Sequence, residues 1–475
     1  QGKQTKRKQR KEKQKQAELE QEKIIRDPIH WAVEFIDTEE FQRLRDIKQL
    51  GTSYYVFPSA CHNRFEHSLG TAHLAYTLTK KLHDQQRIEK NEHDLECTTL
   101  AGLCHDLGHG PFSHVFDNEV IPKIAPGLNW KHEDGSEMMF NRLYDRMESH
   151  SIDLSTDDLK YIKNLIKGDR TKRSPYLFDI VANKRNSVDV DKFDYLARDC
   201  YYLGMDSLFD PSRLMKFSYV IDNQIVYHHK EYFNIYEMFH TRYSLYKRVY
   251  THRVTRALNF MLRDALLKAN PKYHFENVIF DPEEYIKLND SILYEIEYSE
   301  SPELKESKEI IKRIRQRKLY KFVNECIIPH NRIDITNENL NEHEIASHNN
   351  GSIHLSEDDI ILDWQNLNYT KGKNNPVEYV KFYNKDRTKV FRLKHERISH
   401  LFPEQYEEKI VRIFSRDSKK VDSIQDAFQK LTKKLGLDIN EGFLTGEKVD
   451  IIDINPNGGG LYNKNEDSVK AFPIQ

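Results

Sequence analysis

Three histidines and an aspartate fall within ten consecutive residues of this chain, at 105–114. The segment reads His-Asp-Leu-Gly-His-Gly-Pro-Phe-Ser-His and follows an apolar run. Imidazole and carboxylate groups together suit a borderline divalent metal such as Mn, Fe, Zn or Ni. Neighbouring residues of a helix point about 100° apart, so His105 and Asp106 alone do not enclose an ion. Other segments must supply the remaining ligands.

A second candidate segment is His-Asn-Arg-Phe-Glu-His-Ser-Leu-Gly at 62–70. Arg64 and His67 are three residues apart, which places both on one face of a helix. The segment is therefore a candidate to supply a further ligand for the same metal ion. The alternative is an ordinary helix residue with an ion pair.

A third candidate segment spans 187–199. Asp191, Tyr195 and Asp199 follow one another at four-residue steps and therefore share one helical face. Alone, this pattern also fits a solvated acidic face. It becomes informative because it occurs together with the two histidine-bearing segments.

Hydrophobic periodicity predicts the helices that must position these segments. They span residues 63–83, 98–107, 156–168, 187–203 and 234–269. Gly108, Gly110 and Pro111 are helix stop signals, so the histidine-rich segment lies at the end of the second helix.

The chain from residue 217 onward mixes helix and strand patterns. Two apolar runs flanking an Asn predict a hairpin of strands 217–221 and 225–227. A charged helix is predicted over 302–326. Short apolar segments alternating with Asn, Gly and Pro over 327–415 are typical of an α+β lobe, with a polar linker at 340–353.

The predicted organisation has four parts. They are a basic tail over 1–23, a helical core over 24–270, an α+β lobe over 271–454 and a flexible tail over 455–475. The first 23 residues hold nine Lys/Arg and four Glu. This favours either a solvated or helical extension or a nuclear-localisation or nucleic-acid-binding patch.

Composition limits the class of protein. The 475 residues are 38% hydrophobic and 31% charged, and 24 Phe and 26 Tyr can fill a large core. No apolar run approaches the ~18 residues of a membrane span, and the N-terminus lacks the apolar core of a secretory signal. Five widely spaced cysteines without a C-x-x-C pair indicate a reducing compartment, either nuclear or cytoplasmic, and argue against a disulfide framework or zinc ribbon.

The order His67, His105-Asp106, Asp191 resembles that of the HD phosphohydrolase superfamily. More closely, the chain resembles the deoxynucleoside triphosphate (dNTP) triphosphohydrolases of that superfamily, whose vertebrate form carries a SAM domain before the HD domain. We expect no SAM domain in these residues. The resemblance rests on the motifs at 41–45, 54–58, 62–70, 101–116, 189–199 and 238–242.

The resemblance implies a mainly α fold, with an HD-type helical phosphohydrolase core and a smaller α+β C-terminal lobe for regulation and oligomerisation. It implies hydrolysis of dNTPs by water attack on the α-phosphorus, which releases deoxynucleoside and tripolyphosphate. A divalent transition metal (Fe, Mn or Zn), together with Mg, would occupy a site of two His and two Asp. The implied metal ligands are His67, His105, Asp106 and Asp191.

The family's catalytic residues carry over to His109, His114, His132 and Asp117. His114 is expected to be the general acid that protonates the departing 5′-oxygen, since an imidazole pKa lies near working pH. The alternative for His132 is an ordinary surface histidine. Asp117 is expected to orient the histidines.

The substrate-binding residues implied by the resemblance are Gln49, Leu50, Arg64, Lys192, Tyr195, Asp199, Arg242 and Tyr250. The two arginines and the lysine would contact the triphosphate. Leu50 and Tyr250 would crowd the sugar 2′ position and exclude ribonucleotides. Thr251 stands where the family has a Gln, so one base contact of the family differs here.

Two effector sites are also implied, together with a homotetramer. The GTP site would use Lys23, Ile24, Asp37, Gln42 and Arg45. The dNTP effector site would use Val56, Phe57, Arg213, Lys230, Asn234 and His252. Arg26 and His228 depart from the family's Asn and Arg, and the loop from Asp27 to Asp37 is shorter. We therefore expect a weakened second effector site.

Two other functions are compatible with the residues. Another HD enzyme, either a phosphodiesterase or a guanosine-polyphosphate hydrolase, would share the metal ligands without needing a crowded 2′ position. A non-catalytic protein that binds single-stranded nucleic acid would depend on the basic tail.

Overall fold

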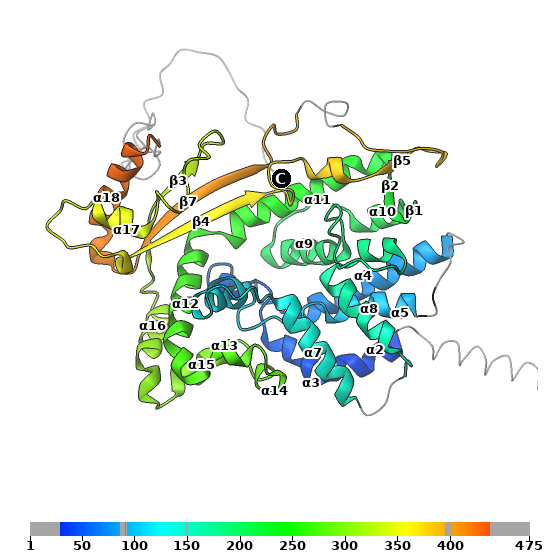
Figure 1. The fold of residues 1–475 in the computed structure, drawn as a ribbon, viewed down its shortest axis with the longest axis horizontal. Coiled ribbons are helices and arrows are strands. Elements are labelled where there is room, and N and C mark those ends of the chain that lie inside the picture. The colour runs from blue at the N-terminus through cyan, green and yellow to red at the C-terminus, as the bar shows by residue number, and fades with distance from the viewer. Residues whose placement is uncertain (1–28, 86–90, 92, 148–150, 395–400, 438–475) are drawn as a thin grey trace, which may run out of the picture.

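The computed structural model describes residues 29–85, 91, 93–147, 151–394 and 401–437 (Figure 1). Helices predominate among the described residues from 29 to 315. They are α2 (Ile29–Ile36), α3 (Glu39–Gln42), α4 (Arg64–Gln85), α5 (Asp94–Cys104), α6 (Ile121–Ile124), α7 (His132–Arg146), α8 (Thr156–Lys167), α9 (Val190–Leu203), α10 (Pro211–Lys216), α11 (Tyr232–Leu245), α12 (Arg253–Tyr273), α13 (Phe275–Val278), α14 (Pro282–Tyr285), α15 (Ile292–Tyr298) and α16 (Lys305–Arg315).

Short helices of other types join these elements. Two are π-helices, η3 (Phe116–Val120) and η6 (Tyr246–Tyr250). The 3-10 helices are η1 (Arg43–Asp46), η2 (Gly51–Tyr55), η4 (Pro175–Asp179), η5 (His229–Glu231), η7 (Pro302–Leu304), η8 (Glu357–Asp359), η9 (Pro376–Tyr379) and η11 (Ser418–Lys420).

Two small sheets accompany the helices. One has the strand order β1 (Ser218–Ile221), β2 (Gln224–His228), β5 (Phe382–Tyr383), β6 (Val390–Phe391). The other is antiparallel, with the order β3 (Lys321–Ile328), β7 (Glu407–Ser415), β4 (Ile360–Asn368). Helices α17 (Glu342–Ser347) and α18 (Val421–Lys434) pack with the second sheet. The expected fold class, mainly α with a smaller α+β C-terminal region, is confirmed.

Helix α4 packs against both α5 and α9. Its contact with α5 is close because Gly102 faces it. A Cβ at Gly102 would lie 3.1 Å from the Thr71 carbonyl oxygen and 3.2 Å from the Ala72 Cα. Helix α9 begins where the Asp189 side chain accepts from the Lys192 amide and ends at Gly204, whose φ is +62°. Three segments far apart in sequence thereby meet.

The three-stranded sheet lies above α12 in Figure 1, and its strands β4 and β7 extend toward α11. A cluster of buried residues joins the sheet to α12 and includes Leu258, Met261, Ile361 and Phe414. The C-terminal region therefore packs on the helical core. Among the described residues, none of the helices combines the length and apolarity that a bilayer crossing needs.

Several predicted elements are confirmed. The helix predicted over 156–168 is α8, and the hairpin is formed by β1 and β2. Asp222 and Asn223, at its turn, have φ values of +52° and +54°, as a tight two-residue turn requires.

Two predictions need correction. The helix expected over 302–326 ends at Arg315, and Arg317 has a φ of +58°. Strand β3 follows, with an alternating burial pattern over much of its length that marks a two-residue period. The polar linker expected at 340–353 contains α17, which Asn341 caps.

The helix expected over 234–269 is interrupted. It divides into α11, η6 and α12, because Thr251 and His252 leave helical geometry. The predicted tails at 1–23 and 455–475, and the effector residues Lys23 and Ile24, lie outside the described residues.

Candidate active site

The predicted metal ligands converge from helices α4 and α9 and from the turn that follows α5. The Nε2 atoms of His67 and His105 are 3.2 Å apart, and Oδ1 of Asp191 lies 3.2 Å from the first and 3.5 Å from the second. Asp106 lies beside both rings, with its oxygens 3.5 Å and 3.4 Å from the same two nitrogens. His67, His105 and Asp191 form a group that could hold a metal ion, and Asp106 lies at its edge, where it also pairs with Arg64 at 2.7 Å.

Hydrogen bonds on the far side of each imidazole set its orientation. Nδ1 of His67 lies 2.8 Å from Oδ2 of Asp194, which Arg198 also binds at 2.8 Å. Nδ1 of His105 donates to the Gly102 carbonyl at 2.8 Å. Such bonds leave both Nε2 atoms free to bind an ion. Sequence reasoning missed the role of Asp194, although its i, i+4 spacing from Arg198 could have indicated a buried pair.

The electrostatics of this cluster also fit a cation. Burial alone would lower the pKa of His67, but hydrogen bonds to Asp191 and Asp194 raise it to about 10. Burial would raise the pKa of Asp191, and its bonds to His105 and His67 outweigh this and hold it well below its usual range. A site that retains a proton so strongly has a negative potential, which favours a divalent ion.

The predicted catalytic residues form a second cluster next to the first. His109, His114, Asp117 and His132 offer nitrogen or oxygen atoms within 4.8 Å of one another. Nδ1 of His132 lies 2.7 Å and Nδ1 of His114 3.4 Å from Oδ2 of Asp117. The rings of His109 and His132 stack with centroids 4.0 Å apart. His132 is therefore a half-buried member of this cluster, beside Asp117.

Asp106 joins the two clusters. Its Oδ1 lies 3.4 Å from Nε2 of His109 and 3.4 Å from Nε2 of His105. Burial would raise the pKa of Asp106, but the charge of Arg64 and the two histidines hold it well below its usual range. The metal cluster and the histidine cluster thus share one ionised carboxylate.

Local backbone conformation brings the histidines together. A Cβ at Gly108 would lie 2.0 Å from the Ser136 amide nitrogen and 2.1 Å from the His132 carbonyl oxygen. Only glycine therefore allows the start of α7 to approach this closely. Phe112 and Ser113 have φ values of +58° and +56°, a strained geometry that is common at functional sites.

The histidines differ in protonation. Burial, followed by the charges of Arg64 and His132, holds the pKa of His109 well below its usual range. Burial would also lower the pKa of His132, but its hydrogen bond to Asp117 raises it instead. His109 is therefore neutral beside a His132–Asp117 ion pair. The side chain of His114 is 58% exposed and faces the solvent.

A buried network holds the histidine loop from behind. The Arg43 guanidinium donates to the carbonyl oxygens of Leu107 at 3.1 Å and His109 at 2.8 Å. The Tyr285 hydroxyl donates to the Gly108 carbonyl at 2.6 Å, and Asp290 accepts from the Phe112 amide at 2.6 Å. Sequence reasoning did not identify these supports, because they lie far from the loop in the chain.

Several predicted substrate residues lie around the two clusters. Arg64 donates to Asp106 at 2.7 Å, to Ser113 Oγ at 3.0 Å and to the Gln49 carbonyl at 3.3 Å. Leu50 follows Gln49 and is half-buried. Arg64 therefore ties the metal cluster to the segment that carries two other predicted contacts.

Tyr250 and Asp199 form a further group. The Tyr250 hydroxyl donates to Oδ2 of Asp199, and Nε2 of His62 lies 2.7 Å from Oδ1 of the same residue. The imidazole of His62 stacks on Tyr202, with ring centroids 4.4 Å apart. Sequence reasoning quoted His62 within its motif without assigning it a role. Its buried ring fixes the predicted sugar-binding pair.

Lys192 and Tyr195 are residues of α9, and Arg242 is a residue of α11. Lys192 Nζ is 3.0 Å from Oδ1 of Asp189. Burial raises the pKa of the Tyr195 hydroxyl well above its usual range, against the charge of Arg242. Arg242 donates to the Asn368 carbonyl at 2.9 Å. Two of the three predicted phosphate-binding cations, Arg64 and Lys192, are thus held in place by carboxylates.

Of the predicted GTP-reading residues, Asp37 lies between α2 and α3, Gln42 lies on α3 and Arg45 lies on η1. Asp37 and Arg45 are exposed. Nε of Arg45 donates to Oε1 of Gln42 at 2.7 Å, and its guanidinium lies 3.5 Å from the centroid of the Phe65 ring. In the described residues, the predicted GTP site therefore consists of polar side chains that solvent can reach.

The predicted dNTP effector residues form separate groups within one chain. The rings of Phe57, which follows Val56, and His252 are 5.8 Å apart. Arg213 pairs with Glu231 at 2.7 Å, the Lys230 amide donates to His228, and Asn234 accepts from the Asp210 amide at 2.9 Å. Within the described ranges no hydrogen bond, ion pair or ring contact joins the first group to the second.

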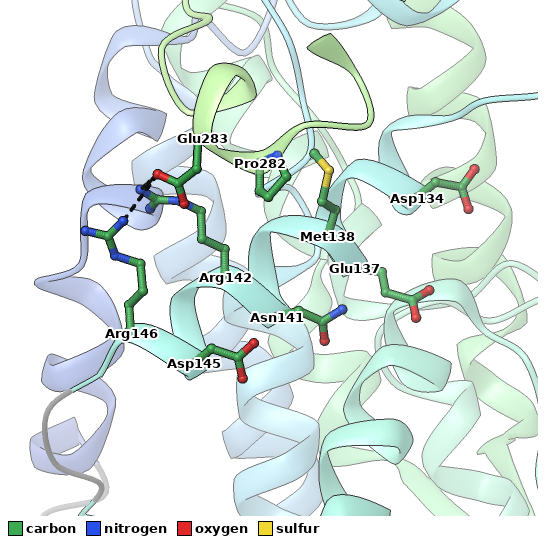
Figure 2. A pocket seen from close by; sticks show the side chains of 9 residues that line it. All are labelled: Asp134, Glu137, Met138, Asn141, Arg142, Asp145, Arg146, Pro282 and Glu283. Carbon is green, nitrogen blue, oxygen red and sulfur yellow. Dashed lines mark hydrogen bonds and ion pairs between the residues drawn. The ribbon is translucent and has the colours of Figure 1, made fainter. Parts of the chain in front are cut away.

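A pocket of about 570 Å³ lies elsewhere, beside α7 and the start of α14 (Figure 2). Arg142 and Arg146 both pair with Glu283 there, at 2.9 Å and 3.3 Å. The other charged groups that line the pocket are the carboxylates Asp134, Glu137 and Asp145, so acidic side chains outnumber the two arginines. None of the predicted site residues lines it.

Comparison with known proteins gives consistent matches. The chain matches the family model of the HD domain over residues 64–199, which includes all four predicted metal ligands, and that of the HD associated region over residues 209–394. A Dictyostelium discoideum protein named "Deoxynucleoside triphosphate triphosphohydrolase SAMHD1 homolog" is 46% identical over 432 residues, which cover 89% of this chain and 82% of that protein.

Two vertebrate proteins named "Deoxynucleoside triphosphate triphosphohydrolase SAMHD1" are similar over almost the same extent. The Bos taurus protein is 41% identical over 442 residues, covering 83% of this chain and 75% of its own length. The Homo sapiens protein is 41% identical over 448 residues, covering 84% and 71%.

Proposed function

This chain belongs to the family of SAMHD1 deoxynucleoside triphosphate triphosphohydrolases, and we propose that it hydrolyses dNTPs to deoxynucleoside and tripolyphosphate. The observation that carries the proposal is the shared Asp106, which contacts His105 of one cluster and His109 of the other. The residues proposed to hold the metal are therefore next to the histidines proposed to transfer protons, which supports hydrolysis of a phosphate ester.

His67, His105, Asp106 and Asp191 are the residues proposed to hold a divalent transition metal, either Fe, Mn or Zn, with Mg as a second cofactor. Such an ion polarises a phosphoryl oxygen and lowers the pKa of bound water. The negative potential of the four side chains supports this assignment, and Asp194 keeps the His67 ring oriented toward the ion.

Proton transfer is assigned to the histidine cluster. His114 is exposed and can reach a bound substrate, and Asp117 accepts from it and holds its ring. Protonated His114 delivers its proton to the 5′-oxygen of the leaving deoxynucleoside. The neutral His109, which stacks on His132, and the His132–Asp117 ion pair set the electrostatic potential around His114.

Substrate selection is assigned to the groups around these clusters. Arg64, Lys192 and Arg242 are proposed to bind the triphosphate, because cationic side chains match phosphate oxygens. Gln49, Tyr195 and Asp199 are proposed to contact the 3′-hydroxyl and the phosphates. Leu50 and Tyr250 are proposed to crowd the 2′ carbon, so that a ribose hydroxyl is excluded.

Activation by GTP is proposed through Asp37, Gln42 and Arg45, together with Lys23 and Ile24. The two groups of dNTP-effector residues are proposed to meet across subunits of a homotetramer, which would explain why nothing in the described residues joins them within one chain. The basic tail is proposed as a solvated or helical extension, with a nuclear-localisation or nucleic-acid-binding patch as the alternative.

The test is product identification. The protein, loaded with Mn²⁺ and Mg²⁺, is incubated separately with dGTP, GTP and single-stranded RNA, and the products are separated by anion-exchange chromatography. We expect deoxyguanosine and tripolyphosphate from dGTP, with GTP and RNA intact. Release of dGMP and pyrophosphate, or breakdown of RNA, would instead favour another HD phosphohydrolase activity.

A further inference from the structure

The turn that follows strand β4 contacts the predicted triphosphate site. Arg242 on α11 donates to the carbonyl of Asn368, the last residue of β4, at 2.9 Å. Thr370 has a φ of +96°, and its amide donates to Asn368 Oδ1 at 2.8 Å. A non-glycine residue in this conformation is strained, so this turn keeps an unfavourable geometry directly beside a phosphate-binding candidate.

Lys371 extends from this turn toward the loop before α9. Its Nζ donates to the Lys184 carbonyl at 3.3 Å and lies 5.6 Å from the Tyr379 ring centroid. Burial and the charge of Lys192 lower the pKa of Lys371, and Asp189 opposes this effect. Lys371 is therefore close enough to Lys192 and Asp189 to respond to their charges, although about 180 residues separate them in sequence.

Two of the three predicted triphosphate-binding cations already pair with carboxylates. Arg64 pairs with Asp106 at 2.7 Å and Lys192 with Asp189 at 3.0 Å. Within the described residues, by contrast, Lys371 forms no ion pair with a carboxylate, and its hydrogen-bond partner is one backbone carbonyl. Its positive charge is therefore available to an anion.

We propose that Lys371, supplied by the C-terminal region, binds the outer phosphates of the substrate and the tripolyphosphate product. This inference rests on the proposed function. The lysine stem has four rotatable carbons, so Nζ can exchange the Lys184 carbonyl for a phosphate oxygen without moving the backbone. The exchange replaces a neutral acceptor by an anionic one and yields a stronger, charge-assisted hydrogen bond.

The assignment gives the C-terminal region a direct part in the active site. Strand β4 is anchored in the second sheet by its pairing with β7. Its final residue is held by Arg242, and the next turn carries Lys371. A displacement of the sheet relative to α11 would therefore move a phosphate-binding cation.

The experiment compares three variants in the full-length, metal-loaded protein. Lys371→Gln removes the charge, Lys371→Arg keeps it, and Lys373→Gln removes an exposed charge two residues away in the same turn. Calorimetry measures tripolyphosphate binding, and steady-state kinetics measure KM and kcat for dGTP together with inhibition by tripolyphosphate.

We expect Lys371→Gln to weaken tripolyphosphate binding and raise KM by about tenfold, with kcat within about twofold of the wild type. Lys371→Arg and Lys373→Gln should resemble the wild type. Equal tripolyphosphate affinity for Lys371→Gln and Lys373→Gln would overturn the inference. If the wild type binds tripolyphosphate in a Lys371-dependent way but does not release it from dGTP, the proposed function fails and the phosphate-binding role of Lys371 stands.

Discussion

The Nδ1 atom of His132 lies 2.7 Å from Oδ2 of Asp117, and this oxygen is also the one nearest to His114, at 3.4 Å. One carboxylate oxygen can thus accept hydrogen bonds from two imidazoles. The shorter bond goes to the histidine whose pKa it raises against the effect of burial. His114, with the longer bond and the more exposed ring, keeps more freedom to move toward a substrate.

Substitution of His114 should separate proton transfer from metal binding. We expect His114→Ala to lower kcat by roughly 100- to 10,000-fold, because a general acid contributes about that much. Metal content, measured by atomic absorption, should stay at the wild-type level. A variant that keeps a normal rate would rule out His114 as the general acid.

Asp191→Ala should remove metal and activity together. Asp191 contributes an oxygen 3.2 Å from one ligand nitrogen and 3.5 Å from another, and it provides much of the charge that balances an ion. Asp145→Ala, a change at an exposed carboxylate on α7, is the matched control. If Asp191→Ala retains both its metal and its turnover, the assigned ligand set is wrong.

Metal binding should depend on pH through His67. In the metal-free protein the pKa of His67 is raised to about 10, because its bonds to Asp191 and Asp194 outweigh burial. An ion must therefore displace a proton below that pH, so the apparent Mn²⁺ affinity should rise about tenfold per pH unit between about pH 7 and pH 9.

The same shift has a stability consequence. A raised histidine pKa stabilises the metal-free fold fully below the unfolded value of about 6.5, and that contribution is lost as the pH rises through about 10.

The coupling of metal binding to His67 is measured by titration calorimetry in buffers of different ionisation enthalpy, which should show release of about one proton per ion near pH 8. Binding without proton release would contradict the protonation of His67.

Sugar discrimination should depend on Leu50. The residue is half-buried and follows Gln49, while the Tyr250 hydroxyl is held by Asp199. We expect the wild type to hydrolyse dGTP and spare GTP, and Leu50→Ala to raise the rate on GTP at least about tenfold by opening space at the 2′ carbon. Leu50→Met, which retains the volume, is the control. Equal rates on dGTP and GTP in the wild type would disprove the steric explanation.

GTP should stimulate hydrolysis of dTTP through the exposed side chains of Asp37 and Arg45. Asp37 can accept from guanine N1 and N2, and Arg45 can donate to O6 and N7, whereas adenine presents the opposite pattern at positions 1 and 6. We expect Asp37→Ala to abolish stimulation without loss of metal, and Asp46→Ala, a neighbouring exposed carboxylate, to retain it. Light scattering with and without GTP reports the accompanying change in mass. Equal dTTP rates with and without GTP, in nucleotide-free protein, would exclude this regulation.

Several features were predictable because their signals are local. Helix α8 has apolar residues at helical spacing between a serine cap and Gly168, and the β1–β2 hairpin has a turn-forming Asn. Strand β3 was missed because the charged helix before it was predicted to continue through the strand. The two-residue burial period of β3 covers too few residues to correct that prediction. Local patterns identify elements well and place their ends poorly.

By itself the sequence determined which residue types were available for chemistry and their order along the chain. His67, His105 and Asp191 could be singled out because each lies in a segment with a recognisable local pattern. Only the tertiary structure decided which distant residues meet, including Asp194 behind His67 and Lys371 at the Lys184 carbonyl. These partners lie more than 120 residues apart. Contacts at such separation depend on how the helices pack and leave no periodic signal in either segment.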